Sequence, residues 1–166
     1  MKILKKLLLV AVAALTFVAC GDDDDEEDNN STTKIENISN WNGTLTVTSQ
    51  LGDFEMSDLG VVTTCTDSSK NCKVEMNQVK FANQMPKQLD LVIDGLTFSV
   101  SDGDTIITGA NISSQYVKEG ELLDAGYAVT SISGKISNGK LSMDVTGSYT
   151  SMNNMSINFS YAGERK

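Results

Sequence analysis

Apolar and polar residues alternate with a period of two over most of the chain after residue 40. The alternation is clearest in 73–77 and in 155–161, where every second side chain is apolar. This pattern predicts strands with one face packed on a core and the other face in water. Similar runs occupy 44–48, 78–81, 89–93, 96–100, 104–107, 127–136 and 140–145. We therefore expect eight or nine short strands in an all-β domain.

The phase of the alternation changes between residues 73 and 81. Val74 and Met76 share one parity, whereas Val79 and Phe81 have the other. A shift of one residue moves every following side chain to the opposite face of a strand. We therefore predict a bulge or bend near Asn77 that returns the later residues to the core.

Turn signals separate these runs about every 8–15 residues. Asn138-Gly139 predicts a hairpin with a type I′ turn, which needs positive φ at both central residues, and Asp102-Gly103 is a second turn signal. Residues 117–124 are the one place where a helical turn is expected. The spacing favours an antiparallel up-and-down β-barrel of about eight strands, with a β-sandwich as the alternative. The expected core is Trp41, Leu45, Val47, Val74, Met76, Phe81, Leu91, Ile93, Phe98, Ile106, Ile132, Ile136, Leu141, Met143, Val145, Ile157 and Phe159.

The first 19 residues have the pattern of a secretory signal. Three lysines, Lys2, Lys5 and Lys6, precede residues 7–19, which are apolar apart from Thr16. A membrane-spanning helix needs roughly 20 apolar residues, so this run is too short to be one. Residues 1–19 are therefore interpreted as a signal peptide.

The residues that end this run, Phe17-Val18-Ala19-Cys20, resemble a bacterial lipobox. The resemblance implies cleavage before Cys20 and attachment of two or three acyl chains at that residue, which is enough for stable anchoring in a membrane. The alternative is a secretory signal without lipid and a chance cysteine.

An acidic run follows the cysteine directly. It consists of Asp22, Asp23, Asp24, Asp25, Glu26, Glu27 and Asp28. Like charges in series stay extended and solvated, so we interpret residues 20–40 as a tether and 41–166 as the folded domain. The run also resembles the signal that exports some lipoproteins to the cell surface. The alternatives are a charged spacer on a lipoprotein facing the periplasm and a calcium site.

The composition excludes several chemistries. The 166 residues include 13 basic and 22 acidic residues and no histidine, for a net charge of −9. Removal of residues 1–19 would leave 10 basic and 22 acidic residues, a net charge of −12. A chain without histidine has no Ser-His-Asp triad and no histidine metal ligand. An acidic chain is also unsuited to nucleic acid, and no cofactor or metal is expected.

Cys65 and Cys72 are the cysteines that remain after Cys20, and they flank a polar loop between two predicted strands. In an oxidising compartment they are expected to form a disulfide that staples the hairpin, worth roughly 2 kcal/mol for so short a loop. The alternatives are a redox-active pair, which the Cys-x6-Cys spacing disfavours, and two reduced thiols.

Three segments together resemble the calycin-like (lipocalin-like) domains of bacterial lipoproteins. They are 41–47 (WNGTLTV), 85–98, which contains LDLVIDGLTF, and 132–141 (ISGKISNGKL), and the resemblance extends from Trp41 to Gly163. It implies a lipocalin-like barrel of about eight strands and no catalytic residues.

Other candidate sites are weaker. Asp90, Asp94 and Glu75 are the candidates for acid–base catalysis, but outer-face residues of a sheet wet on one side are the simpler interpretation. Asp102 and Asp104 favour a plain turn over a cation loop. The segment 104–106 (Asp-Thr-Ile) also resembles a bacterial O-glycosylation acceptor. Five methionines suit either an adaptable cavity or core filler: Met76, Met85, Met143, Met152 and Met155.

The sequence thus predicts a non-catalytic, lipid-anchored protein of the outer membrane, displayed on the cell surface or facing the periplasm. Its barrel is expected to bind a small apolar or amphipathic ligand. The alternative is an accessory subunit of an envelope or nutrient-uptake complex, with a solid barrel that binds a partner protein. No ligand-binding residue can be assigned from the sequence.

Overall fold

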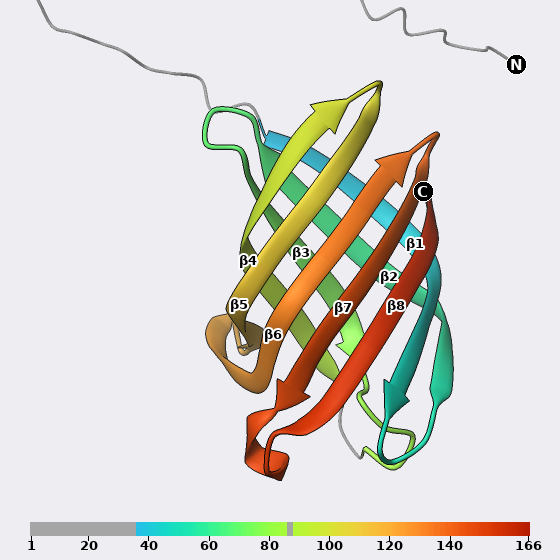
Figure 1. Ribbon diagram of the computed structural model, residues 1–166, viewed down its shortest axis with the longest axis vertical. Helices are drawn as coiled ribbons and strands as arrows, with labels where there is room; N and C mark the ends of the chain where they lie inside the picture. The colour runs from blue at the N-terminus through green and yellow to red at the C-terminus, as the bar shows by residue number, and fades with distance from the viewer. Residues whose placement is uncertain (1–35, 86–87) are drawn as a thin grey trace, which may run out of the picture. The chain divides into compact units, whose positions relative to one another are not determined.

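Eight antiparallel strands follow one another along the chain and close into a barrel (Figure 1). The computed structural model describes residues 36–85 and 88–166. Each strand pairs with the next, and β8 pairs with β1, so the sheet has no free edge. This confirms the meander barrel and excludes the sandwich. The elements are β1 (Glu36–Ser49), β2 (Phe54–Thr66), β3 (Asn71–Val79), β4 (Leu89–Ser101), β5 (Asp104–Lys118), β6 (Glu121–Ser137), β7 (Lys140–Tyr149), the 3₁₀ helix η1 (Thr150–Met152) and β8 (Met155–Arg165).

Three of the hairpins turn on two residues that both have positive φ. These are Asp102-Gly103, Glu119-Gly120 and Asn138-Gly139. The first and third confirm the predicted turns. The second shows that the helical turn expected within 117–124 is wrong, because this segment is the tip of the β5–β6 hairpin. Glu119 and Gly120 supply the geometry there that asparagine and glycine supply more commonly.

The predicted bulge lies in β3. The pairing of β3 with β4 shifts between Met76 and Val79, and Gln78 has a φ of 57°. The amide of Gln78 donates to Oδ1 of Asp90 at 2.9 Å instead of to the strand ladder. Met76, Val79 and Phe81 are all buried as a result, so the extra residue keeps both halves of the segment on the core.

Two sequence assignments need correction. β1 begins at Glu36, so residues 36–40, which the sequence placed in the tether, belong to the first strand. In β5 the core residue is Ile107, fully buried opposite Phe98, whereas the predicted Ile106 is half-buried and pairs with Ser99. When two neighbouring residues are both isoleucine, the sequence alone does not show which of them faces the core. Here the pairing of β5 with β4 turns Ile107 inward.

The meander places alternate connections at opposite ends of the barrel (Figure 1). We call one end the N-terminal end, because β1 begins there and β8 finishes there. The other end, which we call the pocket end, holds the β1–β2 turn, the β3–β4 connection, the β5–β6 hairpin tip and η1.

Side chains fill the barrel between these ends. Trp41 is fully buried and its Nε1–H donates to Oγ1 of Thr63 at 3.0 Å. The guanidinium of Arg165 lies 5.2 Å from the centre of the Trp41 ring. The Phe81 ring stacks on Tyr127 with centroids 4.8 Å apart, and Phe159 lies 5.7 Å from Tyr127. The barrel is therefore a packed core in its middle, not a channel.

Two tyrosines in this core, Tyr127 and Tyr161, are expected to make the stability of the fold sensitive to alkali. Burial raises the pKa of Tyr127 well above its ordinary value and raises that of Tyr161 to about 12. Their hydroxyls donate to the carbonyls of Ile157 and Leu59. Above pH about 10 the unfolded chain loses these protons first, so the free energy of unfolding should fall as pH rises, by at most about 1.4 kcal/mol per pH unit for each tyrosine.

Urea titrations at pH values from neutral to strongly alkaline check this expectation. Tyr161→Phe should flatten the alkaline fall and lower neutral stability by about 1 kcal/mol, because it removes one hydrogen bond. Thr63→Val, which removes the buried hydroxyl that accepts the Trp41 Nε1–H but removes no ionisable group, is the control and should leave the alkaline fall unchanged. Equal alkaline slopes for Tyr161→Phe and the unaltered chain would contradict the prediction.

Candidate ligand-binding pocket

A cavity of about 440 Å³ opens at the pocket end of the barrel. It lies between the β1–β2 turn, the β3–β4 connection and the segment around η1. Its walls are apolar apart from the amide of Gln84 and the hydroxyl of Tyr149. The lining residues are Leu51, Phe81, Ala82, Gln84, Met85, Leu89, Tyr149, Met152, Met155 and Ile157.

Aromatic rings close the inner end of this pocket. Phe81 lines it and is buried against Tyr127, Tyr149 and Phe159, with centroid distances of 4.8, 5.9 and 6.3 Å. The hydroxyl of Tyr127 donates to the carbonyl of Ile157 at 2.8 Å. A molecule in the pocket would therefore contact Phe81, and the aromatic rings packed against Phe81 fill the barrel beyond it.

The methionines divide between the two roles that the sequence left open. Met76 and Met143 are buried core residues. Met85, Met152 and Met155 line the pocket instead, where an unbranched, polarizable side chain adapts to different shapes. Methionine also holds the β3–β4 connection, because the amide of Phe81 donates to the sulfur of Met85 at 3.3 Å.

Most residues of the pocket lining were not predicted from the sequence. Leu51, Gln84 and Leu89 belong to connections or strand ends, and no motif in the sequence marks Tyr149. The signal that could have found them is large apolar residues inside connections, such as Leu51 in the β1–β2 turn and Met152 in η1.

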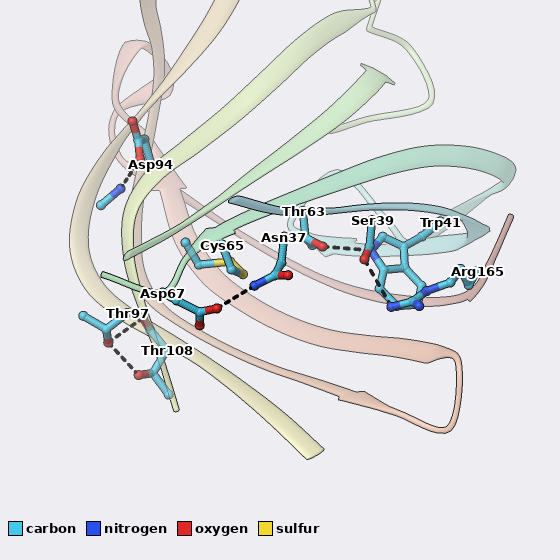
Figure 2. The surroundings of a disulfide bond; sticks show 12 residues. Asn37, Ser39, Trp41, Thr63, Cys65, Asp67, Asp94, Thr97, Thr108 and Arg165 are labelled. Carbon is cyan, nitrogen blue, oxygen red and sulfur yellow. Dashed lines mark hydrogen bonds between the residues drawn. A yellow bond between two sulfur atoms is a disulfide. The ribbon is translucent and has the colours of Figure 1, made fainter. Parts of the chain in front are cut away.

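The N-terminal end of the barrel carries a disulfide and hydrogen-bonded polar side chains in place of an apolar pocket (Figure 2). Cys65 and Cys72 lie opposite each other in the β2–β3 ladder and form a disulfide, as predicted. Near them Nδ2 of Asn37 donates to Oδ2 of Asp67 at 3.0 Å, and Nη2 of Arg165 donates to Oγ of Ser39 at 3.2 Å. Polar groups and a disulfide-linked hairpin thus lie at this end, whereas an apolar pocket opens at the opposite end.

The structure does not bring the candidate catalytic carboxylates to a cavity. Asp90 accepts the Gln78 amide, and Asp94 accepts the amide of Gly95 at 2.7 Å. Glu75 forms an ion pair with Lys73 at 3.1 Å. No carboxylate lines the pocket among the residues that the structure describes.

Asp102 and Asp104 serve a hairpin turn. Asp102 has a φ of 53° in the turn, and the carboxylate of Asp104 lies 2.6 Å from Nζ of Lys135. Hydrogen bonds from Lys135 and then from Ser137 hold the pKa of Asp104 below its ordinary value. In residues 36–85 and 88–166, no group of three acidic or cysteine side chains could hold a metal ion. Glycosylation at Thr105 stays a prediction.

Several predictions fall outside the described residues. Cys20 and the acidic run 22–28 lie there, so lipidation and surface export stay predictions. Within the described part of the chain, no helix is both long and apolar enough to cross a membrane.

No family model matches the chain, and no curated protein matches it in sequence. Among solved structures, it is similar to a Bacteroides fragilis NCTC 9343 protein provisionally described as an outer membrane protein. This match has a TM-score of 0.50 and 15% sequence identity and covers 78% of the chain. The chain spans half the length of that protein.

A second similarity is to a double mutant of the vaccine antigen transferrin binding protein B from Haemophilus parasuis Hp5. It has a TM-score of 0.45 and 8% identity, and covers 80% of this chain and 25% of that one. The first similarity supports the fold alone. The eight-stranded antiparallel meander barrel itself defines the class: the chain has a calycin-like fold.

Proposed function

We propose that this chain is a surface-displayed, lipid-anchored protein of the outer membrane whose barrel binds a small apolar or amphipathic molecule without catalysing a reaction. The pocket of about 440 Å³ is the observation that carries the binding role. Sites for small molecules are concave, mostly apolar and upwards of about 300 Å³. This cavity has that size and lining.

The topology is compatible with anchoring at Cys20. The described chain begins at Glu36, at the end of the barrel opposite the pocket. A tether that joins the barrel there leaves the pocket end free to meet molecules away from the membrane. The fold shared with a protein provisionally described as an outer membrane protein is in keeping with this location.

The absence of a catalytic role rests on the lining of the pocket. General acid–base chemistry most often uses a histidine, a carboxylate or a lysine within hydrogen-bond reach of the bound molecule, and among the described residues none of these lines the pocket. In the described residues the pocket offers the Gln84 amide and the Tyr149 hydroxyl as its polar side-chain groups. These walls favour binding through apolar contacts, so we propose the pocket as a carrier site.

A fluorescence titration with the neutral dye N-phenyl-1-naphthylamine tests the binding role. The titration uses residues 20–166 with the substitution Cys20→Ser. A chain without lipid needs no detergent, which would compete for the pocket. Saturable binding is expected, and the pair Leu51→Gln and Met152→Gln should weaken it about tenfold, because two apolar contacts are lost.

The matched control changes two apolar residues at the opposite end. Ile38→Gln and Val100→Gln alter side chains that are 61% and 63% exposed and lie far from the pocket lining. This pair should leave the affinity unchanged. Equal loss in both pairs, or no saturable binding by the unaltered chain, would refute a pocket for small molecules and favour the alternative of a solid barrel that binds a partner protein.

A further inference from the structure

Thioether groups are concentrated at the pocket. The chain has seven methionines, and three of them, Met85, Met152 and Met155, are among the ten residues that line this cavity. The hollow at the N-terminal end, of about 560 Å³, is lined by Phe98 and by aliphatic, polar and charged residues, and no methionine is among them. The pocket therefore differs from the hollow at the other end in its sulfur content as well as in its polarity.

Two of these methionines lie beside aromatic residues of the same lining. Met155 is directly opposite Tyr149 in the β7–β8 ladder, and the β-carbons of such a pair are about 5 Å apart. The sulfur of Met85 accepts the amide of Phe81 at 3.3 Å, which holds that thioether next to Phe81. The wall of the pocket thus combines thioethers with aromatic rings.

Both kinds of group favour an aromatic ring over a saturated one. A thioether sulfur about 5 Å from an aromatic ring makes a favourable contact, commonly at the edge of the ring. Phenyl and phenol rings also bind a further ring, stacked with an offset or edge to face, more strongly than burial of area explains. A saturated ring gains from the burial of its apolar surface alone.

The position of Met152 adds an adaptable contact at the mouth. It belongs to η1, its side chain is 47% exposed, and it lines the pocket. An unbranched side chain with three rotatable bonds adjusts to the shape of what enters. Met152 is therefore placed to close onto a bound ring without moving a residue of the packed core.

The lining also indicates the charge of the ligand. Among the described residues no charged side chain lines the pocket. An ionised group would lose its hydration there without gaining an opposite charge, which is costly, whereas a hydroxyl has the Gln84 amide and the Tyr149 hydroxyl as partners. These walls favour a neutral molecule.

We propose that the pocket binds a neutral molecule with a flat aromatic ring system, held by the thioethers of Met85, Met152 and Met155 and by the rings of Phe81 and Tyr149. This inference rests on the proposed carrier function and names the ligand class of that site. It distinguishes an aromatic ligand from a saturated one of the same skeleton, a distinction that burial of apolar surface alone does not make.

Two probes with one carbon skeleton test the proposal: 2-naphthol and decahydro-2-naphthol, each titrated at neutral pH by isothermal titration calorimetry. The protein is the chain of residues 20–166 with Cys20→Ser. The saturated probe has at least as much apolar surface, so burial alone would make it bind equally well or more tightly. We expect 2-naphthol to bind about tenfold more tightly, which corresponds to about two ring or sulfur contacts.

A variant without two of the sulfurs isolates their contribution. Met152→Leu with Met155→Leu keeps the apolar volume of the wall, and Met85 stays because its sulfur accepts the Phe81 amide. The preference for 2-naphthol should fall from about tenfold to about threefold. The matched control is Met76→Leu with Met143→Leu, two methionines buried in the core and outside the lining, and it should keep the tenfold preference.

A spectroscopic measurement locates the bound ring independently of affinity. In protein labelled with ¹³C at the methionine methyl groups, an aromatic ring shifts the resonances of the methyls that it contacts. Saturation with 2-naphthol should move the resonances of Met85, Met152 and Met155 and leave those of Met76 and Met143 in place.

The outcomes separate this inference from the carrier function. If neither probe binds and the dye does not saturate, the carrier function is refuted and the inference with it. If both probes bind equally well, or the saturated probe binds more tightly, the pocket is a carrier site but the preference for aromatic rings is overturned. An undiminished preference in the Met152→Leu and Met155→Leu variant would overturn the role of the sulfurs.

Discussion

Replacing Cys20 with alanine is expected to release the protein from the membrane fraction entirely. The lipobox-like segment before Cys20 predicts two or three acyl chains on that residue. Each buried methylene contributes about 0.8 kcal/mol, so two chains hold a protein stably in a bilayer whereas one does not. Fractionation of cells that express Cys20→Ala, with labelled palmitate as a second readout, should show soluble, unlabelled protein.

The other two cysteines provide the matched control. Cys65→Ala with Cys72→Ala removes the disulfide but leaves the lipidation site, and this variant should keep both the label and the membrane association. Persistence of Cys20→Ala in the membrane fraction would disprove the anchor. An unaltered chain that takes up no label would support the alternative of a secretory signal without lipid.

Display on the surface is tested separately by protease treatment of intact cells. Replacing the acidic run 22–28 with asparagine and glutamine should keep the lipid but protect the barrel from external protease. If the run is only a spacer, accessibility should not change.

The strands and the hairpins were predictable because their signals are local. Alternation fixes which side chains of β7 and β8 face the core, and Asn138-Gly139 fixes the turn between β6 and β7. The bulge near Asn77 was predictable for the same reason, since the change of phase is visible within nine residues. Neighbouring residues determine these features, and a single sequence contains that information.

The errors occurred where neighbours were ambiguous. Ile106 and Ile107 are both apolar, so their order on the strand depends on pairing with β4. Leu122 and Leu123 are adjacent, exposed apolar residues that interrupt the alternation, and they concealed the β5–β6 hairpin. In both cases the deciding contact lies on another strand.

The pocket could not be predicted because it is assembled from distant segments. Leu51 and Phe81 are 30 residues apart in the chain, and Phe81 and Met155 are 74 residues apart. These side chains line one pocket only when the barrel closes. Sequence could suggest that methionines line a cavity, but it could not tell Met155 from Met143. What separates them is position along the barrel: Met143 is in the packed middle and Met155 is at the open end.

Closure of the barrel depends on the seam between β1 and β8, where Gly43 lies directly opposite Gly163. A β-carbon added at Gly43 would overlap the carbonyl oxygen of Ala162 and the α-carbon of Gly163, both backbone atoms of β8. Backbone atoms cannot move aside as a flexible side chain does, so Gly43→Ala must push the two strands apart or twist them.

Gly43→Ala is therefore expected to lower the free energy of unfolding by about 3 kcal/mol, at the upper end of the cost of overpacking. Gly60→Ala is the matched control, because its β-carbon would meet only the side-chain nitrogen of Asn77, at 3.3 Å. That variant should stay within about 1 kcal/mol of the unaltered chain. Urea denaturation measures both, and hydrogen exchange should show faster exchange of β1 and β8 amides in Gly43→Ala alone. Equal stability of the two variants would mean that the seam accommodates a side chain and that the close approach of β1 to β8 does not limit closure.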